Sequence, residues 1–133
     1  MDNIRWLRKQ IMTGTYYDPR DSGKTHQWIA ASDIGFFVGE FFAHPADWMG
    51  KALDIAGDEL SIAEYTDVLS VTMGIDVHHQ QITWDAYEAD AGEEMTIMMR
   101  WFDQIGYEVD VEALRAKYPD LLTYEQYLNR LDR

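Results

Sequence analysis

The chain has 133 residues, of which 47% are hydrophobic and 14% aromatic, so it can form one domain with a real core and is not disordered or fibrous. Eleven basic against 24 acidic residues give a net charge of -13, which disfavours direct binding to nucleic acid or to an anionic membrane. The absence of cysteine excludes disulfides, thiol catalysis and cysteine-bound zinc. We therefore expect a single acidic domain over residues 1–133, cytoplasmic, with no nucleic-acid or membrane partner.

The first part of the chain is predicted to contain a helix, a loop and a short strand. Ile4, Leu7 and Ile11 recur at helical spacing, and Gly14 can end that helix. Residues 15–25 are rich in turn formers and are predicted as a loop. Residues 26–30 follow as a short strand.

The next helix is predicted to begin after Ser32 or Asp33, either of which can cap it. Its apolar residues follow the i, i+3, i+4, i+7, i+8 pattern, namely Ile34, Phe37, Val38, Phe41 and Phe42. Gly35 and Gly39 permit a close approach, which favours tight packing on a sheet over passage of a ligand. A second strand is predicted over residues 51–56. If parallel to the first strand, it would complete a right-handed βαβ unit.

The middle of the chain contains the clearest start signal for a helix. Ser61 and Glu64 form a capping box, and Gly74 stands where the helix would end. A strand is predicted next, over residues 75–82. It is followed by a 3–4 spacing of apolar residues from Trp84 to Ile105, which predicts one long helix.

The apolar stripe of this long helix predicts that Met95, Met98 and Phe102 face inward. Methionines in such a stripe usually pack in a core, and a methionine-lined ligand pocket is the alternative. The acidic residues at the start of the helix are expected to form a solvated face, where they favour the positive end of the helix dipole.

Two short helices are predicted to close the chain, one over residues 111–117 and one capped by a box that begins at Thr123. The order of elements predicts a mixed α/β (α+β) fold. It is a helix-rich unit with a small sheet of two to three strands.

The sequence holds no motif that carries chemistry on its own. No G-x-G-x-x-G or G-x-x-x-x-G-K-[ST] loop is present to hold phosphates. His78 and His79 would point to opposite faces of a strand, so they are predicted to be surface or core residues and not a metal pair. We therefore assign no catalytic, cofactor-binding or metal-binding residue.

Five segments in order resemble the C-terminal part of the NmrA-like family, atypical members of the short-chain dehydrogenase/reductase superfamily. They are Met1-Asp2-Asn3, residues 31–35, the stretch Gly50-Lys51-Ala52-Leu53-Asp54-Ile55-Ala56-Gly57-Asp58 with Leu60-Ser61 after it, residues 114–121, and Thr123-Tyr124-Glu125. The resemblance covers nearly the whole chain. It implies the substrate-side subdomain of an NmrA-like Rossmann protein, without the nucleotide-binding half.

The resemblance also implies what this chain lacks and what it retains. The family's NAD(P)-binding loop and catalytic tyrosine and lysine would lie before Met1, so no cofactor is expected in this chain. Asn3 matches a segment that lines the substrate cleft in relatives and is a pocket candidate. Trp6 and Trp28 are added as neighbours, although each is more often a core residue.

Two functions follow from the resemblance. One is the substrate-side portion of an NAD(P)-linked oxidoreductase or redox sensor, non-catalytic by itself. The other is a non-enzymatic regulatory module that binds protein partners. In either case apolar surface left by a missing Rossmann domain would favour self-association or a protein partner, with Ile4–Ile11 and the helix around Gly35 and Gly39 as the leading surfaces.

Overall fold

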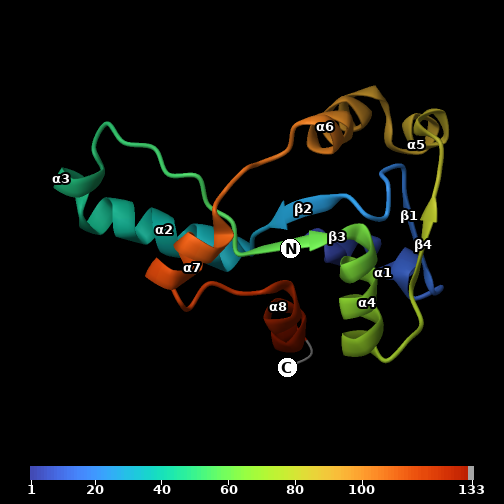
Figure 1. The fold of residues 1–133 in the computed structure, drawn as a ribbon, viewed down its shortest axis with the longest axis horizontal. Helices are drawn as coiled ribbons and strands as arrows, with labels where there is room; N and C mark the ends of the chain where they lie inside the picture. The colour runs from blue at the N-terminus through green and yellow to red at the C-terminus, as the bar shows by residue number, and fades with distance from the viewer. Residues whose placement is uncertain (132–133) are drawn as a thin grey trace. The chain divides into compact units, whose positions relative to one another are not determined.

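The computed structural model describes residues 1–131, and in that range it contains eight helices and four short strands (Figure 1). In chain order they are α1 Ile4–Ile11, β1 Thr15–Asp18, β2 Thr25–Trp28, α2 Ala31–Ala43, α3 Pro45–Trp48, β3 Asp58–Ser61, α4 Ile62–Met73, β4 His78–Gln81, α5 Trp84–Ala91, α6 Glu93–Gln104, α7 Val111–Lys117 and α8 Tyr124–Leu131. The strands form two sheets of two strands each. This confirms the predicted mixed α/β class, with two small sheets where one sheet of two to three strands was predicted.

The chain divides into two compact units. Residues 1–2, 27–59 and 109–131 belong to the first unit, and residues 3–26 and 60–108 belong to the second. Strands β2 and β3 pair with each other, and each runs from one unit into the other. Cooperative folding of both units as a single domain stays a prediction.

The second unit is built on a parallel pair of strands. β1 pairs with β4 so that Thr15 lies opposite His78 and Asp18 opposite Gln81. The expected loop over residues 15–25 is therefore wrong in its first part. Tyr16 and Asp18 alternate with the exposed Tyr17 as a half-buried strand should. The partner strand lies about sixty residues away in the sequence, so no local pattern indicates the pairing.

Helix α4 packs beside this sheet and begins and ends as predicted. The Ser61 hydroxyl accepts the Glu64 backbone N–H, while the Glu64 carboxylate accepts the Ser61 backbone N–H. Gly74 ends the helix in the left-handed conformation, with φ of 65°. The buried face of α4 is formed by Ile62, Tyr65, Thr66 and Leu69.

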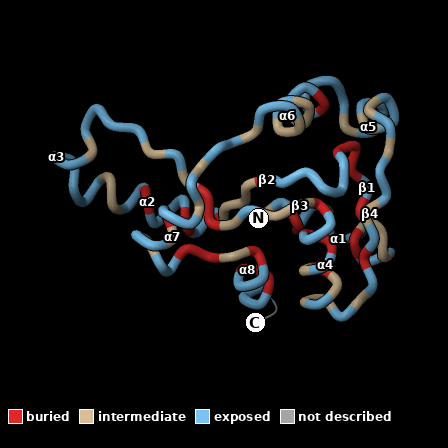
Figure 2. Tube along the Cα trace, in the orientation of Figure 1, coloured by how far each residue is buried: buried red, intermediate tan, exposed pale blue. Residues whose placement is uncertain are grey.

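The first unit has its core where α2 meets the C-terminal segment. Phe37, Leu114 and Leu121 are buried together, and Leu53 and Ile55 pack against them. Figure 2 shows buried stretches, in red, on α2 and on the segment before α8. The strand predicted over residues 51–56 is wrong, because these apolar side chains pack against this cluster from an irregular segment. β3 forms just after it. The arrows of β2 and β3 point in opposite directions in Figure 1, so the expected parallel βαβ unit is also wrong.

Asp33 has a tertiary role in this unit. The N-cap residue of α2 is Ala30, and neither Ser32 nor Asp33 caps the helix. Asp33 is buried in the first turn, and its carboxylate accepts the backbone N–H of Leu122 at 2.9 Å. Asp33 therefore fixes α2 to the segment before α8, which is a structural role other than the one predicted.

The predicted long helix is broken at Gly92. This residue has φ of 88° and ψ of 164°, a conformation that only glycine adopts readily, and it separates α5 from α6. On α6 the buried residue is Thr96, whereas Met95 and Met98 are 43% and 41% exposed. The prediction that these methionines face inward is wrong. Because the break at Gly92 makes α6 a separate helix, the apolar stripe of α5 does not determine which side of α6 is buried.

Gly92→Ala is expected to lower the free energy of unfolding by about 1–3 kcal/mol, because alanine is strained in this backbone conformation. The matched control is Gly35→Ala. Gly35 lies inside α2 with nothing within 4 Å of an added Cβ, so alanine there should stabilise by about 0.5–1 kcal/mol. Urea denaturation measures both changes. Equal effects of the two substitutions would contradict the break at Gly92.

The open space at Gly35 also corrects the expectation of tight helix–sheet packing. Gly39 likewise has nothing within 4 Å of an added Cβ. Among residues 1–131, no helix has the length and apolarity needed to cross a bilayer.

Candidate functional site

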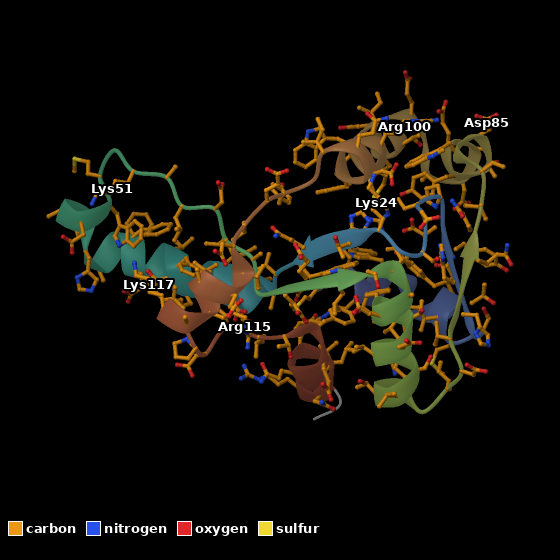
Figure 3. All side chains as sticks on the ribbon, in the orientation of Figure 1. Lys24, Lys51, Asp85, Arg100, Arg115 and Lys117 are labelled. Atoms are coloured by element: carbon orange, nitrogen blue, oxygen red, sulfur yellow. The ribbon has the colours of Figure 1, made fainter. Side chains whose placement is uncertain are left out.

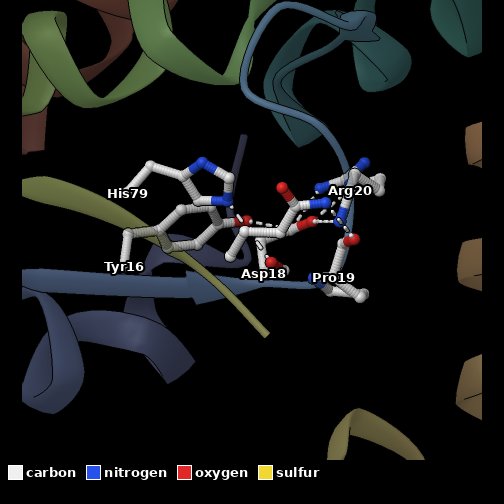
Figure 4. Close-up of polar contacts among 6 residues, drawn as sticks. Tyr16, Asp18, Pro19, Arg20 and His79 are labelled. Atoms are coloured by element: carbon white, nitrogen blue, oxygen red, sulfur yellow. Dashed lines mark hydrogen bonds and ion pairs between the residues drawn. The ribbon is translucent and has the colours of Figure 1, made fainter. Parts of the chain in front are cut away.

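The second unit contains a group of polar side chains, Tyr16, Asp18, Arg20, His26 and His79, that we call the buried polar centre. The first four are buried and His79 is half-buried. Figure 4 shows Tyr16 and Arg20 at the Asp18 carboxylate and His79 at the Asp18 backbone carbonyl. Tyr16 and Asp18 are two residues apart on β1, so the alternation of the strand places both on its buried face. Pro19 then ends the strand and leads the chain to Arg20.

The Asp18 carboxylate accepts four hydrogen bonds. Arg20 supplies three of them: its Nε at 2.8 Å, its Nη2 at 2.6 Å and its backbone N–H at 2.9 Å. The Tyr16 hydroxyl donates the fourth, at 2.8 Å. The side chains of Arg20 and Asp18 are both almost completely buried. A bidentate pair of this kind satisfies both charges out of contact with water.

These contacts fix the protonation states at neutral pH. Burial acts to raise the pKa of Asp18, but the hydrogen bonds and the charge of Arg20 outweigh it and hold that pKa below its ordinary value. Burial and the neighbouring Asp18 charge raise the pKa of Tyr16 well above its ordinary value. Asp18 is therefore an anion and Tyr16 a neutral hydrogen-bond donor.

His26 has a buried side-chain atom without a hydrogen-bond partner among the described residues. The atom is Nε2, and the His26 side chain is buried. Burial and the positive charge of Arg20 lower its pKa to about 4, so the imidazole is neutral at pH 7. His79 differs, because its Nε2 lies 3.3 Å from the carbonyl oxygen of Asp18 and can donate to it.

The centre thus contains the neutral His26 imidazole beside the Arg20–Asp18 ion pair. None of its side chains is an activated nucleophile. The predicted loop over residues 15–25 conceals this centre, because it hides the strand that carries Tyr16 and Asp18. The available signal was the recurrence of polar side chains at every second residue, at Tyr16, Asp18 and Arg20.

A pH prediction follows from His26. Its pKa is about 4 in the folded chain and 6.5 ordinarily, so between these values the unfolded chain binds a proton that the folded chain excludes. This contribution to stability is complete above pH 6.5 and is lost as the pH falls toward 4, by up to about 3 kcal/mol. Arg20, Asp18, Asp103 and Lys24 all act on this group.

His26→Gln removes the titrating group and should flatten the loss of stability between pH 6.5 and 4. The exposed His44 provides the control, since His44→Gln should leave the profile unchanged. Urea denaturation at several pH values measures both. Parallel profiles for the parent chain and His26→Gln would contradict the role of His26.

The predicted pocket residues are only partly brought together. Asn3 is the exposed N-cap of α1 and accepts the backbone N–H of Trp6 at 3.0 Å through its own carbonyl. Trp6 is 87% exposed on the same turn. Trp28 belongs to the other compact unit, where its ring lies 5.7 Å from that of Tyr124. A shared pocket for these three residues stays a prediction.

The histidine pair diverges as expected. His78 is exposed and its Nε2 lies 2.9 Å from a carboxylate oxygen of Asp76, whereas His79 faces the buried polar centre. In the part of the chain that the structure describes, no group of three or more possible ligands could hold a metal ion.

The helix N-termini do not fit a dinucleotide. A pyrophosphate is held at a helix that opens with a glycine-rich turn directly after a strand. In the described residues, α2, α4 and α5 follow strands, and each carries a carboxylate in its first turn: Asp33, Glu64 and Asp85. None of these three helices opens with glycine, and the Ser61 backbone N–H is already bonded to Glu64. A phosphate would meet negative charge at all three positions.

Comparison with known proteins identifies the class. Residues 7–128 match the model of the NmrA-like family, which covers most of the chain. The chain therefore belongs to the NmrA-like family, which confirms the resemblance carried by its motifs.

The fold is also shared with a solved structure. The chain is similar to a nucleoside-diphosphate-sugar epimerase from Staphylococcus aureus, with a TM-score of 0.74 and 16% sequence identity. The match covers 94% of this chain and 47% of that chain, so this chain spans about half the length of that protein. No curated protein sequence matches the chain.

Proposed function

We propose that the chain is the substrate-side portion of an NmrA-like NAD(P)-linked oxidoreductase or redox sensor, and that it is non-catalytic by itself. The observation that carries this proposal is the unequal coverage of the structural match. Nearly all of this chain, but only about half of the longer protein, is included in it. The family match over residues 7–128 supports the same assignment.

The buried polar centre supports the non-catalytic part of the proposal. Asp18 and Arg20 neutralise each other through short hydrogen bonds, and the hydroxyl of Tyr16 is committed to the same carboxylate. A general acid or base needs a pKa near the working pH. The contacts of Asp18 and Tyr16 move their pKa values away from neutrality in opposite directions.

We expect calorimetric titration of the chain with NADPH to give no saturable heat at micromolar concentrations. The strand-to-helix N-termini carry carboxylates, and the net charge of -13 repels the ligand. Losing several charge-assisted hydrogen bonds to a pyrophosphate, each worth about 1.5–3 kcal/mol, would weaken a micromolar site beyond detection. Saturable one-to-one binding would overturn the proposal of a cofactor-less portion.

Substrate recognition in the complete protein would involve Asn3 and Trp6. The exposure of both residues supports this role. They lie at the start of α1 and face solvent, where the indole of Trp6 could cover a ligand. Trp28 is kept as a candidate from its own unit. Its ring is only partly buried, although it already packs on Tyr124.

Helix α2 supports the idea of an absent neighbour. Ile34, Val38 and Phe42 are exposed on one side of the helix, together with the open positions Gly35 and Gly39. A nucleotide-binding half, or a second copy of the chain, would cover such a surface. We propose the former, since the structural relative is about twice as long as this chain.

The second candidate function is a non-enzymatic regulatory module that binds a protein partner. The observation that favours it is the exposed apolar side of α6, with Ile97 and Trp101 on the helix and Ile105 at its C-cap. Exposed apolar patches of this kind commonly mark interaction sites.

A further inference from the structure

Helix α6 exposes large apolar side chains along one side. Ile97, Met98 and Trp101 follow helical spacing, Ile105 continues it at the C-cap, and the four side chains are between 38% and 66% exposed. We call these four residues the α6 surface. Trp101 is held in place by Tyr107, whose ring centroid lies 5.2 Å away. The ring of Tyr107 therefore restrains Trp101, and the four side chains form one continuous apolar face.

The segment that carries this surface is strongly acidic. Residues 84–108 contain seven acidic residues, Asp85, Glu88, Asp90, Glu93, Glu94, Asp103 and Glu108, and one basic residue, Arg100. The guanidinium of Arg100 lies 4.5 Å from the centre of the Trp84 ring. Figure 3 labels Arg100 on α6 and Asp85 on α5. Lys24 reaches Asp103 at 3.5 Å, so one of the seven acids is paired from outside the segment.

Glu94 connects the charge to the apolar face. It is exposed and precedes Ile97 and Met98 by three and four residues on the same helix, so it lies on the same side one turn earlier. A ligand covering Ile97 and Met98 would lie within reach of the Glu94 carboxylate.

This combination selects one kind of partner. An apolar face bordered by acids complements a helix that carries leucine-like residues on one side and lysine or arginine beside them. Methionine side chains adapt to partners of different shape. An anionic membrane or a nucleic acid would be repelled, and a second copy would bring two acidic rims together.

We propose that the α6 surface docks a basic amphipathic helix of a protein partner. The proposal rests on the second candidate function, a regulatory interaction module, and adds to it the surface and the chemistry of the partner.

The test uses an 18-residue synthetic peptide of leucine and lysine with helical spacing, and a counterpart in which every lysine is glutamate. Calorimetric titration of the full chain should show saturable one-to-one binding of the lysine peptide, weakening as salt is raised. The glutamate peptide should not bind. Equal binding of both peptides would overturn the proposal, because apolar adhesion alone would then explain it.

Two pairs of variants locate the site. Ile97→Asp should weaken lysine-peptide binding at least tenfold, whereas Val71→Asp, at an exposed apolar position on α4, should leave it unchanged. Glu94→Lys should weaken binding several-fold, with Asp67→Lys on α4 as the matched charge control. Circular dichroism confirms that each variant is folded. Equal losses within either pair would show that binding is not located at the α6 surface and would overturn the assignment.

Other occupants give different results. Loss of binding in Phe42→Asp but not in Ile97→Asp would move the docking site to α2; the interaction module would then survive and the α6 proposal would fail. No peptide binding by the parent chain would count against both. Two further outcomes would replace the proposed partner with another one: a dimer in sedimentation that Ile97→Asp dissociates, or binding to vesicles containing phosphatidylglycerol.

Discussion

Replacing Asp18 with asparagine is expected to lower the free energy of unfolding by about 3–5 kcal/mol, because it leaves the buried Arg20 guanidinium without its counter-charge. The carboxylate accepts both the Nε and the Nη2 of Arg20, and both side chains are almost completely buried. Asparagine keeps the shape of the side chain but has one acceptor oxygen and no charge. Urea denaturation at pH 7 measures the loss.

The matched control is the exposed pair formed by His78 and Asp76. Their side chains are 74% and 80% exposed, and Asp76→Asn should change stability by less than about 1 kcal/mol. The double variant Asp18→Asn with Arg20→Met should be more stable than Asp18→Asn alone, since no unpaired charge remains buried. A loss below about 1 kcal/mol for Asp18→Asn would show that water reaches Arg20.

Phe37→Ala should also lower the free energy of unfolding by about 3–5 kcal/mol, because it leaves a cavity in the core of the first unit. The Phe37 ring is buried and contacts the rings of Phe41 and Tyr118, at centroid distances of 6.3 Å and 4.9 Å. The same helix supplies the control. Phe42 is 83% exposed, so Phe42→Ala should be close to neutral.

Phe37→Ala also tests whether residues 1–133 fold as a single domain. A single cooperative transition that shifts as a whole would support that prediction, which the division into two compact units leaves open. Two transitions, of which Phe37→Ala shifts only one, would show that the units unfold independently.

The candidate site was predicted less well than the fold. The family resemblance implies Asn3 as a pocket residue, and Trp6 and Trp28 were added as its neighbours. The structure puts Asn3 and Trp6 on one exposed turn. The buried polar centre escaped prediction because its members are joined through a strand pairing. His79 reaches Asp18 only through the pairing of β1 with β4, and their separation of 61 residues in the sequence leaves no local signal of a shared environment.

The sequence by itself determined the features whose interactions lie within a few residues. The helices Ile4–Ile11, Ile62–Met73 and Val111–Lys117 were predicted from apolar spacing, caps and terminal signals, because their hydrogen bonds join residues three or four apart. The family assignment likewise came from short motifs.

Tertiary structure decided the features that depend on distant partners. β1 forms against β4, which is about sixty residues away in the sequence. Asp33, predicted as a helix cap, is a buried acceptor for the backbone N–H of Leu122, 89 residues away. The apolar period from Trp84 to Ile105 is continuous in the sequence, but the backbone at Gly92 divides it into two helices. Met95 and Met98, on the second of them, are exposed. Periodicity records which residues share a side of a helix, but only packing decides which side is covered.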